Sequence, residues 1–108
     1  MERNTSGDVT SFQSILLSKV TNPIINFEIN NTFEQWSKIY DADTNKIISF
    51  GITPIFRGVN QTDRKKVLVI MQAEDGVLDR FMDENHETIK ASGHIIESTQ
   101  IEIYLDQC

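Results

Sequence analysis

Apolar side chains occupy both alternating faces of residues 66–73, where Val67, Val69 and Met71 point one way and Leu68 and Ile70 the other. A strand that is apolar on both faces has a covering layer above and below it. Leaving either set in water would cost roughly 4 kcal/mol, a large share of the net stability of a domain. The pattern therefore predicts the central strand of a sheet that is covered on both faces.

Three other segments carry strand patterns. Residues 24–30 and 99–105 alternate apolar with polar side chains, which is typical of strands that have one buried face. Residues 52–59 also predict a strand. Because Pro54 cannot donate a hydrogen bond to a neighbouring strand, we expect this strand at an edge of the sheet.

Two segments have the period of amphipathic helices. The first begins at Thr32, which has capping-box spacing to Gln35, and we expect it to break within residues 41–45 and to close at Gly51. The second opens at residues 75–76 and closes at Gly93 in the same way. A shift of 42 residues superimposes Gly51 on Gly93 and Trp36 on Leu78, so the chain consists of two βαβ halves.

The element order βαββαβ favours one fold. Right-handed crossovers predict an α+β, ferredoxin-like domain with a four-stranded antiparallel sheet in the order 4-1-3-2 and two helices on one face. The other face then has an apolar centre and polar flanks. Such a face favours a homodimer in which two sheets enclose a shared cavity, as in dimeric α/β barrels. The alternative is a monomer whose N-terminal segment covers this face.

The N-terminal 22 residues differ from the rest of the chain. Residues 1–9 are polar, whereas Phe12, Ile15, Leu16 and Val20 share a helical face. We therefore expect a flexible or short helical arm over residues 1–22, ending near Pro23, and a ferredoxin-like domain over residues 23–108.

The charge and the cysteine content restrict the partners. A formal charge of −6 opposes nucleic-acid and membrane-surface binding, and the cations at residues 64–66 are most simply a solvated turn. The sequence contains no long apolar segment of the kind that predicts export or membrane insertion. Cys108 is the single cysteine, so no internal disulfide can form and we expect a cytoplasmic protein.

Polar residues on the helix-free face are candidates for a ligand site. Glu28 and Glu102 lie on strands that are neighbours in this topology, and two carboxylates about 5 Å apart demand a cation or a raised pKa. Arg57 is the candidate cation and Tyr104 a candidate hydrogen-bond donor. His94 is either a ligand-binding or general-base residue or a strand-entry residue, and the carboxylates are alternatively solvated side chains.

Other motifs indicate no metal, cofactor or catalytic set. Residues 41–45 resemble the start of an EF-hand loop, but Lys46 replaces the required glycine and Ile52 the final glutamate. His86 and His94 are too far apart in sequence to share one helical turn. We find no glycine-rich phosphate loop and no Ser/His/Asp or Cys/His arrangement.

About three quarters of the chain resembles a family of small uncharacterised proteins found mainly in cyanobacteria. The resemblance is carried by NTFEQW at 31–36, by FGI, Pro54 and RGV within 50–59, by QA at 72–73 with Gly76, and by GH and EST within 93–99. It implies a ferredoxin-like fold and a cytoplasmic setting, and it brings no known activity or catalytic residue.

The sequence leaves three functions open. The first is a homodimeric, non-enzymatic module that binds a small molecule or a protein partner. The second is an enzyme similar to the cofactor-independent monooxygenases and isomerases that use dimeric α/β barrels, by analogy of fold alone. The third is an adaptor that docks a partner through its N-terminal arm.

Overall fold

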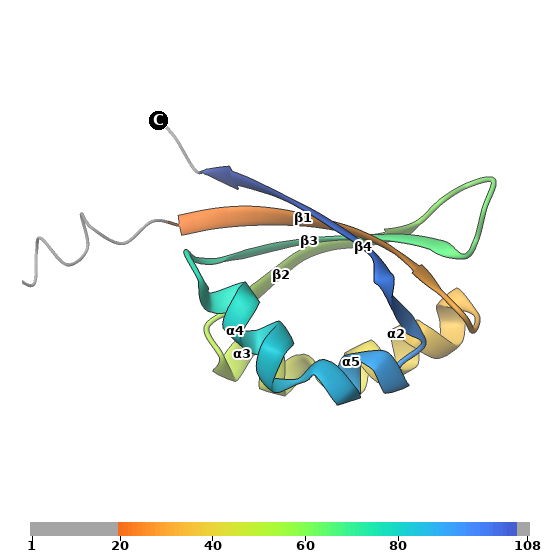
Figure 1. The fold of residues 1–108 in the computed structure, drawn as a ribbon, viewed down its shortest axis with the longest axis horizontal. Coiled ribbons are helices and arrows are strands. Elements are labelled where there is room, and N and C mark those ends of the chain that lie inside the picture. Colours follow the sequence, from red (N-terminus) through yellow and green to blue (C-terminus); the bar gives the residue numbers. More distant parts are fainter. Residues whose placement is uncertain (1–19, 106–108) are drawn as a thin grey trace, which may run out of the picture.

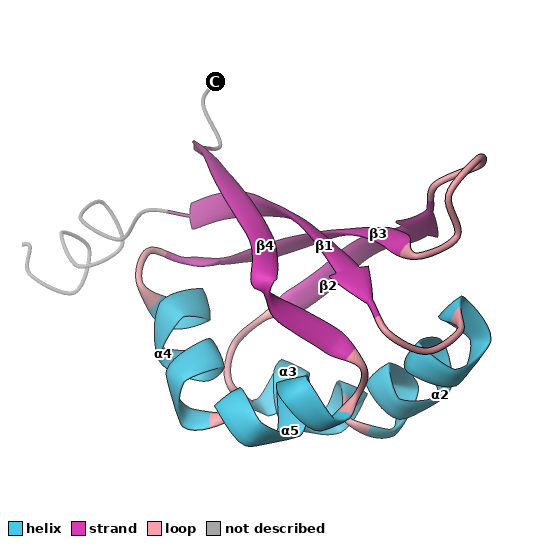
Figure 2. Ribbon diagram, turned by 45° about the vertical axis from the view of Figure 1, so that its right-hand side comes forward, coloured by secondary structure: helices cyan, strands magenta, loops and turns pink. Residues whose placement is uncertain are grey.

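The computed structural model describes residues 20–105 as an antiparallel sheet with helices on one face (Figure 1). The elements are β1 (Val20–Ile29), α2 (Phe33–Ala42), α3 (Thr44–Ser49), β2 (Thr53–Val59), β3 (Lys66–Glu74), α4 (Val77–Glu84), α5 (His86–Ala91) and β4 (His94–Leu105). The strand order β2-β3-β1-β4 is the predicted order read from the other edge. The ferredoxin-like α+β fold is therefore confirmed, and Figure 2 shows that none of the helices within residues 20–105 lies on the other face of the sheet.

The core lies between the sheet and the helices. Every second residue of β1 and β3 points into it, and Val67 and Val69 are each only 2% exposed. Trp36 and Ile47 cover them from one helix pair, and Leu78 and Phe81 from the other. The alternation seen in the sequence therefore assigned the residues of β3 to the correct two faces.

The first predicted helix is confirmed at its start, its break and its end. The Thr32 side chain accepts a hydrogen bond from the Gln35 backbone amide, and the Gln35 side chain accepts one from the Thr32 amide. Asp43 separates α2 from α3. Gly51 has φ 94°, a left-handed conformation that suits glycine at a helix end.

The prediction of one continuous second helix is wrong. Asn85 has φ −116° and ψ 22°, outside helical values, and it divides the segment into α4 and α5. Its side-chain amide donates to the Phe81 carbonyl over 2.9 Å, and its backbone amide donates to the same oxygen. Asparagine often competes in this way with the regular helical pattern.

The first strand begins earlier than predicted. β1 starts at Val20, so the expectation of a helix that reaches Pro23 is wrong from Val20 onwards, and residues 1–19 of the predicted arm lie outside the described residues. Asn22 and Pro23 of β1 have no register partners in β3. Because proline has no N–H group to donate, this gap in the pairing allows it to lie in an inner strand. Next to this gap, the Thr21 hydroxyl donates to the Ala73 carbonyl over 2.8 Å.

The last strand also begins earlier than predicted, at His94 instead of residue 99. Its register against β1 shifts between Asn26 and Glu28, so β4 contains a bulge. The Ser98 hydroxyl holds this bulge, because it accepts from the Glu28 amide over 2.7 Å and donates to the Ile95 carbonyl over 2.6 Å. The bulge lets the His94 end and the Leu105 end both pair with β1.

Candidate functional site

A cavity of about 80 Å³ lies between the sheet and the helices. Its wall is mostly apolar and comes from both inner strands, from β4 and from all the described helices. The lining residues are Ile25, Phe27, Trp36, Tyr40, Asp43, Lys46, Ile47, Val69, Met71, Leu78, Phe81, Met82, Asn85, Thr88, Ile89, Ser92 and His94.

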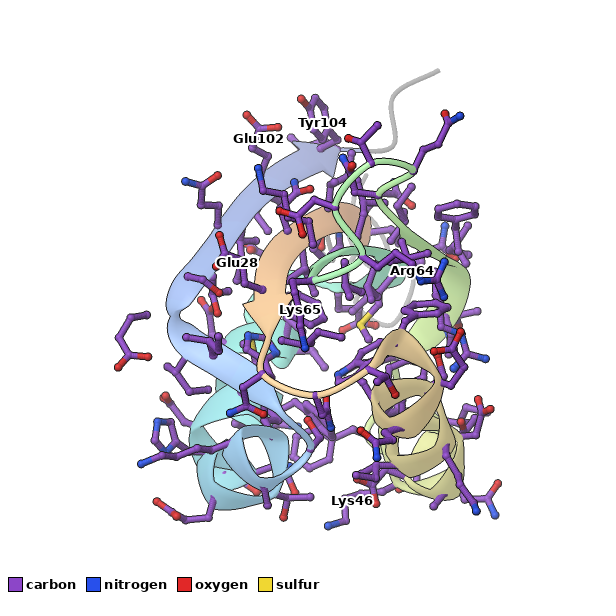
Figure 3. All side chains as sticks on the ribbon, turned by 90° about the vertical axis from the view of Figure 1, so that its right-hand side faces the viewer. Glu28, Lys46, Arg64, Lys65, Glu102 and Tyr104 are labelled. Carbon is purple, nitrogen blue, oxygen red and sulfur yellow. The ribbon has the colours of Figure 1, made fainter. Side chains whose placement is uncertain are left out.

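The mouth of the cavity lies at the outer side of the helix layer. Lys46 and Thr88 are the lining residues with exposed side chains, and Asp43 and Asn85 are half-exposed. Lys46 belongs to α3 and Thr88 to α5, so the mouth lies between the two helix pairs. Figure 3 shows Lys46 at this position, with α4 and α5 on one side and α2 and α3 on the other.

His94 forms part of the inner wall and is only 6% exposed. Its ring stacks on Phe27 with centroids 3.9 Å apart and planes 2° from parallel. Its Nε2 atom lies 2.6 Å from the Thr99 hydroxyl oxygen, on the same strand. Burial lowers the pKa of His94 to about 4, so the imidazole is neutral at pH 7.

The connection before β4 places His94 in this wall. Gly93 has φ 103°, and a side chain there would overlap the amide group of Asn31. The Asn31 side chain donates to the Ser92 carbonyl over 2.9 Å, and the Asn30 amide donates to the Gly93 carbonyl over 2.8 Å. These bonds join the end of β1 to the start of β4 directly before His94.

Aromatic rings continue the wall away from His94. Phe27 lies 5.4 Å from Trp36, and Trp36 lies 4.9 Å from Tyr40, measured between ring centroids. The phenol ring of Tyr40 is covered in turn by the Arg57 guanidinium, 5.0 Å from its centroid. Burial is the main cause that raises the pKa of Tyr40, and Arg57 opposes it. The cavity is therefore bordered by rings that are all neutral at pH 7.

Arg57 lies on the helix side of the sheet and not beside the glutamates. It pairs in register with Val69, forms a 2.8 Å ion pair with Asp41 of α2, and its guanidinium lies 3.4 Å from the Ser37 carbonyl. The expectation that Arg57 compensates Glu28 and Glu102 is therefore wrong in its geometry. The cause is a bulge between Pro54 and Phe56, which reverses the alternation along β2.

Glu28, Glu102 and Tyr104 lie on the helix-free face, as predicted, but the two carboxylates are not neighbours. Glu102 pairs with Ile24, four residues from Glu28 along β1, which corresponds to roughly 13 Å. Glu28 pairs instead with Lys66 of β3. The Tyr104 hydroxyl donates to Glu102 over 3.2 Å, and Figure 3 shows this pair at the far end of β4 from Glu28.

A comparison with known protein families gives one decisive match. The model of a domain of unknown function, DUF3764, matches residues 20–106, most of the 108-residue chain. The chain belongs to the DUF3764 family. This confirms the expectation of an uncharacterised family. No curated protein and no solved structure matches the chain.

Sequence reasoning assigned two lining residues of this DUF3764 domain, Val69 and Met71, to one face of the central strand, and it placed Trp36 and Leu78 on the helices, but it did not predict the cavity. Asn85 and Ser92 were not singled out, although both line it. An asparagine in the middle of an apolar helical stripe is the signal that was available. The void itself depends on how side chains from seven elements meet, and no spacing in the sequence reports that.

Neither a metal site nor a membrane span is found in the described part of the DUF3764 domain. Within residues 20–105, no three His, Cys, Asp or Glu side chains are grouped to hold a metal ion. None of the helices in that range is long and apolar enough to cross a bilayer.

Proposed function

We propose that this DUF3764 domain is a homodimeric binding module that holds one small, largely apolar molecule in the cavity of each subunit. The observation that carries the proposal is the cavity itself, which combines an apolar wall with a buried neutral histidine. Apolar pockets with a few convergent polar groups are the usual form of small-molecule sites. Since Cys108 is the single cysteine, we also propose a cytoplasmic setting.

The geometry favours binding over acid–base catalysis. An efficient general base has a pKa near the working pH. The pKa of His94 is about 4, because its ring is buried. At pH 7 this imidazole is a weak base but a good neutral hydrogen-bonding group. A binding module therefore fits His94 better than the isomerase or monooxygenase alternative.

Benzene is the probe that tests the binding function, since small apolar cavities accept it. Trp36 lines the cavity and is the single tryptophan, so its fluorescence reports occupancy. We expect saturable benzene binding. Replacement Ile89→Phe should fill the cavity and abolish this binding.

The matched control is Ile48→Phe, since Ile48 is 55% exposed on α3 and does not line the cavity. This variant should bind benzene like the unmodified chain. Absence of saturable binding in the unmodified chain, or equal binding by Ile89→Phe, would reject the proposed function.

The second copy in the proposal covers the helix-free face of the sheet. Phe56 is 53% exposed there, and Ile24, Leu68 and Ile70 beside it are half-buried. These side chains form one apolar strip across β2, β3 and β1, because Phe56 and Ile24 both pair with Ile70. An exposed strip of this kind is typical of an interaction surface.

The charges on this face support a two-fold arrangement. Lys66 lies at one end of β3, where it pairs with Glu28, and Glu74 lies at the other end. A two-fold axis that runs across the strands, between two stacked sheets, places Lys66 of one copy over the Glu74 end of the other. The same axis brings the two apolar strips together.

Light scattering tests the dimer. We expect about twice the chain mass of 12.4 kDa for the unmodified protein and a single chain mass for Ile70→Lys, which places a charge in the apolar strip. The control Ile48→Lys, on the helix side, should remain dimeric. A monomeric unmodified protein would refute the dimer and leave the binding proposal intact.

A further inference from the structure

The size of the cavity limits its ligand to a single small ring. A buried water needs about 10–15 Å³ of space by the measure that gives 80 Å³ here. The cavity therefore has room for roughly five to eight non-hydrogen atoms. Benzene, phenol and toluene are in this range, whereas two-ring molecules are too large.

The wall favours an aromatic ligand. Five of the lining side chains carry rings, namely Phe27, Trp36, Tyr40, Phe81 and His94. Aromatic rings attract one another in stacked and edge-to-face arrangements by about 0.5–1.5 kcal/mol beyond the burial of their area. Most of the remaining inner lining is aliphatic or thioether, including Met71, Leu78 and Ile89, and these side chains can pack against a flat ring.

Charge restricts the ligand further. Asp43 and Lys46 are the charged residues that line the cavity, and both lie at its mouth. Their opposite charges cancel, so the mouth exerts no net attraction on a ligand that carries a carboxylate or an ammonium group. The inner wall offers no counter-ion among the described residues, and burying an ion without one is costly. The ligand is therefore neutral.

Among residues 20–105, one ring nitrogen of His94 has no hydrogen-bond partner. His94 uses Nε2 toward Thr99, and its Nδ1 atom has no hydrogen-bond partner in the described part of the chain. Two further polar lining residues already donate one hydrogen bond each, Asn85 to the Phe81 carbonyl and the Ser92 hydroxyl to the Ile89 carbonyl. Either tautomer of His94 leaves Nδ1 able to donate or to accept one bond.

We propose that the cavity takes a neutral, single-ring aromatic molecule that carries one hydroxyl group, with the hydroxyl bonded to Nδ1 of His94. A hydroxyl group donates and accepts, so it satisfies the ring nitrogen in both tautomers. This inference rests on the proposed function and names the class of its ligand. A ligand without a polar group would fill the same space but leave Nδ1 unpaired.

Phenol and benzene together test this ligand class, with Trp36 fluorescence as the readout for both. In the unmodified chain, phenol should bind at least as tightly as benzene. Water solvates the phenol hydroxyl better than it solvates benzene, and the bond to Nδ1 of His94 offsets this cost of desolvation. His94→Phe keeps a ring in the wall and removes both nitrogens. We expect it to weaken phenol binding by about tenfold and to change benzene binding by no more than about twofold.

The exposed histidine provides the control. His86 has a side-chain exposure of 51% on α5 and does not line the cavity, so His86→Phe should leave both affinities unchanged. A second measurement needs no variant, because the ring nitrogens of His94 should shift in nitrogen-15 NMR spectra on addition of phenol and not of benzene.

The outcomes separate the two proposals. Equal effects of His94→Phe on phenol and benzene, with no phenol-specific shift of the His94 nitrogens, overturn the hydroxyl-aromatic class while benzene binding upholds the module. If neither compound binds the unmodified chain, the cavity is not a ligand site and both proposals fail.

Discussion

The two faces of the sheet have the same backbone but different chemistry. On the helix-covered face, β1 and β3 present closely packed apolar side chains that become a cavity only where the two helix pairs separate. On the helix-free face, apolar residues such as Ile70 stand between Lys66, Glu28 and Glu102 and remain partly exposed. The comparison indicates that residues 20–105 complete the first face by themselves, whereas within the same residues no layer covers the second face.

The largest expected difference in stability is between alanine substitutions of two phenylalanines, one on each face of the sheet. Phe27 is 4% exposed in the core and Phe56 is 53% exposed on the helix-free face. Phe27→Ala should lower the free energy of unfolding by about 3–5 kcal/mol, because it removes a large buried side chain and leaves a void. Phe56→Ala should lower it by less than about 1 kcal/mol in the monomer, measured by urea denaturation.

Measuring both losses of stability at several protein concentrations extends this first prediction. If a second copy covers Phe56, the Phe56→Ala loss should grow with protein concentration, whereas the Phe27→Ala loss should not. Equal losses for the two variants at every concentration would contradict the difference between the faces.

The pH dependence of stability distinguishes the buried histidine from the exposed one. The pKa of His94 falls from 6.5 to about 4 on folding, so the unfolded chain binds more protons between these values. Stability should therefore fall as the pH drops from about 6.5 to 4, by about 3 kcal/mol from this residue.

The variant His94→Phe should have a flatter stability profile between pH 4 and 6.5 than the unmodified chain, while His86→Phe should keep the original slope. The charged residues that share the cavity with His94 are Asp43 and Lys46, at its mouth. Urea denaturation at several pH values measures all three profiles. Identical slopes for His94→Phe and the unmodified chain would mean that the imidazole is not buried in its neutral form.

The smallest expected effects compare two hydroxyl groups. The Thr99 hydroxyl lies 2.6 Å from the His94 ring in a partly buried position, and the exposed Tyr104 hydroxyl donates to Glu102. Thr99→Val should cost about 1–2 kcal/mol, because it leaves the His94 nitrogen unpaired. Tyr104→Phe should cost less than about 0.5 kcal/mol, since solvent replaces the bond. Equal losses in thermal unfolding would argue against a protected environment at His94.

Local patterns in the sequence predicted local features of the fold. Alternation assigned Val67, Val69 and Met71 to the core face of β3, and the spacing of Thr32 and Gln35 predicted the start of α2. Both signals depend on residues within a few positions of each other. They are therefore readable without knowledge of the rest of the chain.

Features that depend on strand register or on packing could not be predicted from such local patterns. The bulge after Pro54 turned Arg57 to the helix side, and the register of β4 placed Glu102 opposite Ile24 instead of beside Glu28. One inserted residue reverses the facing of every later residue in a strand, and alternation alone does not locate the insertion. His94 was a candidate from its place after Gly93, but its burial follows from contacts with Phe27 and Thr99.

The most direct measurement follows isoleucine methyl groups by NMR while benzene is added. Ile25, Ile47 and Ile89 line the cavity, whereas Ile24 and Ile70 lie on the helix-free face. We predict saturable shifts of the three cavity methyl groups and constant signals from the other two. Shifts confined to Ile24 and Ile70, with the cavity signals unchanged, would contradict the assignment of ligand binding to the helix-covered face.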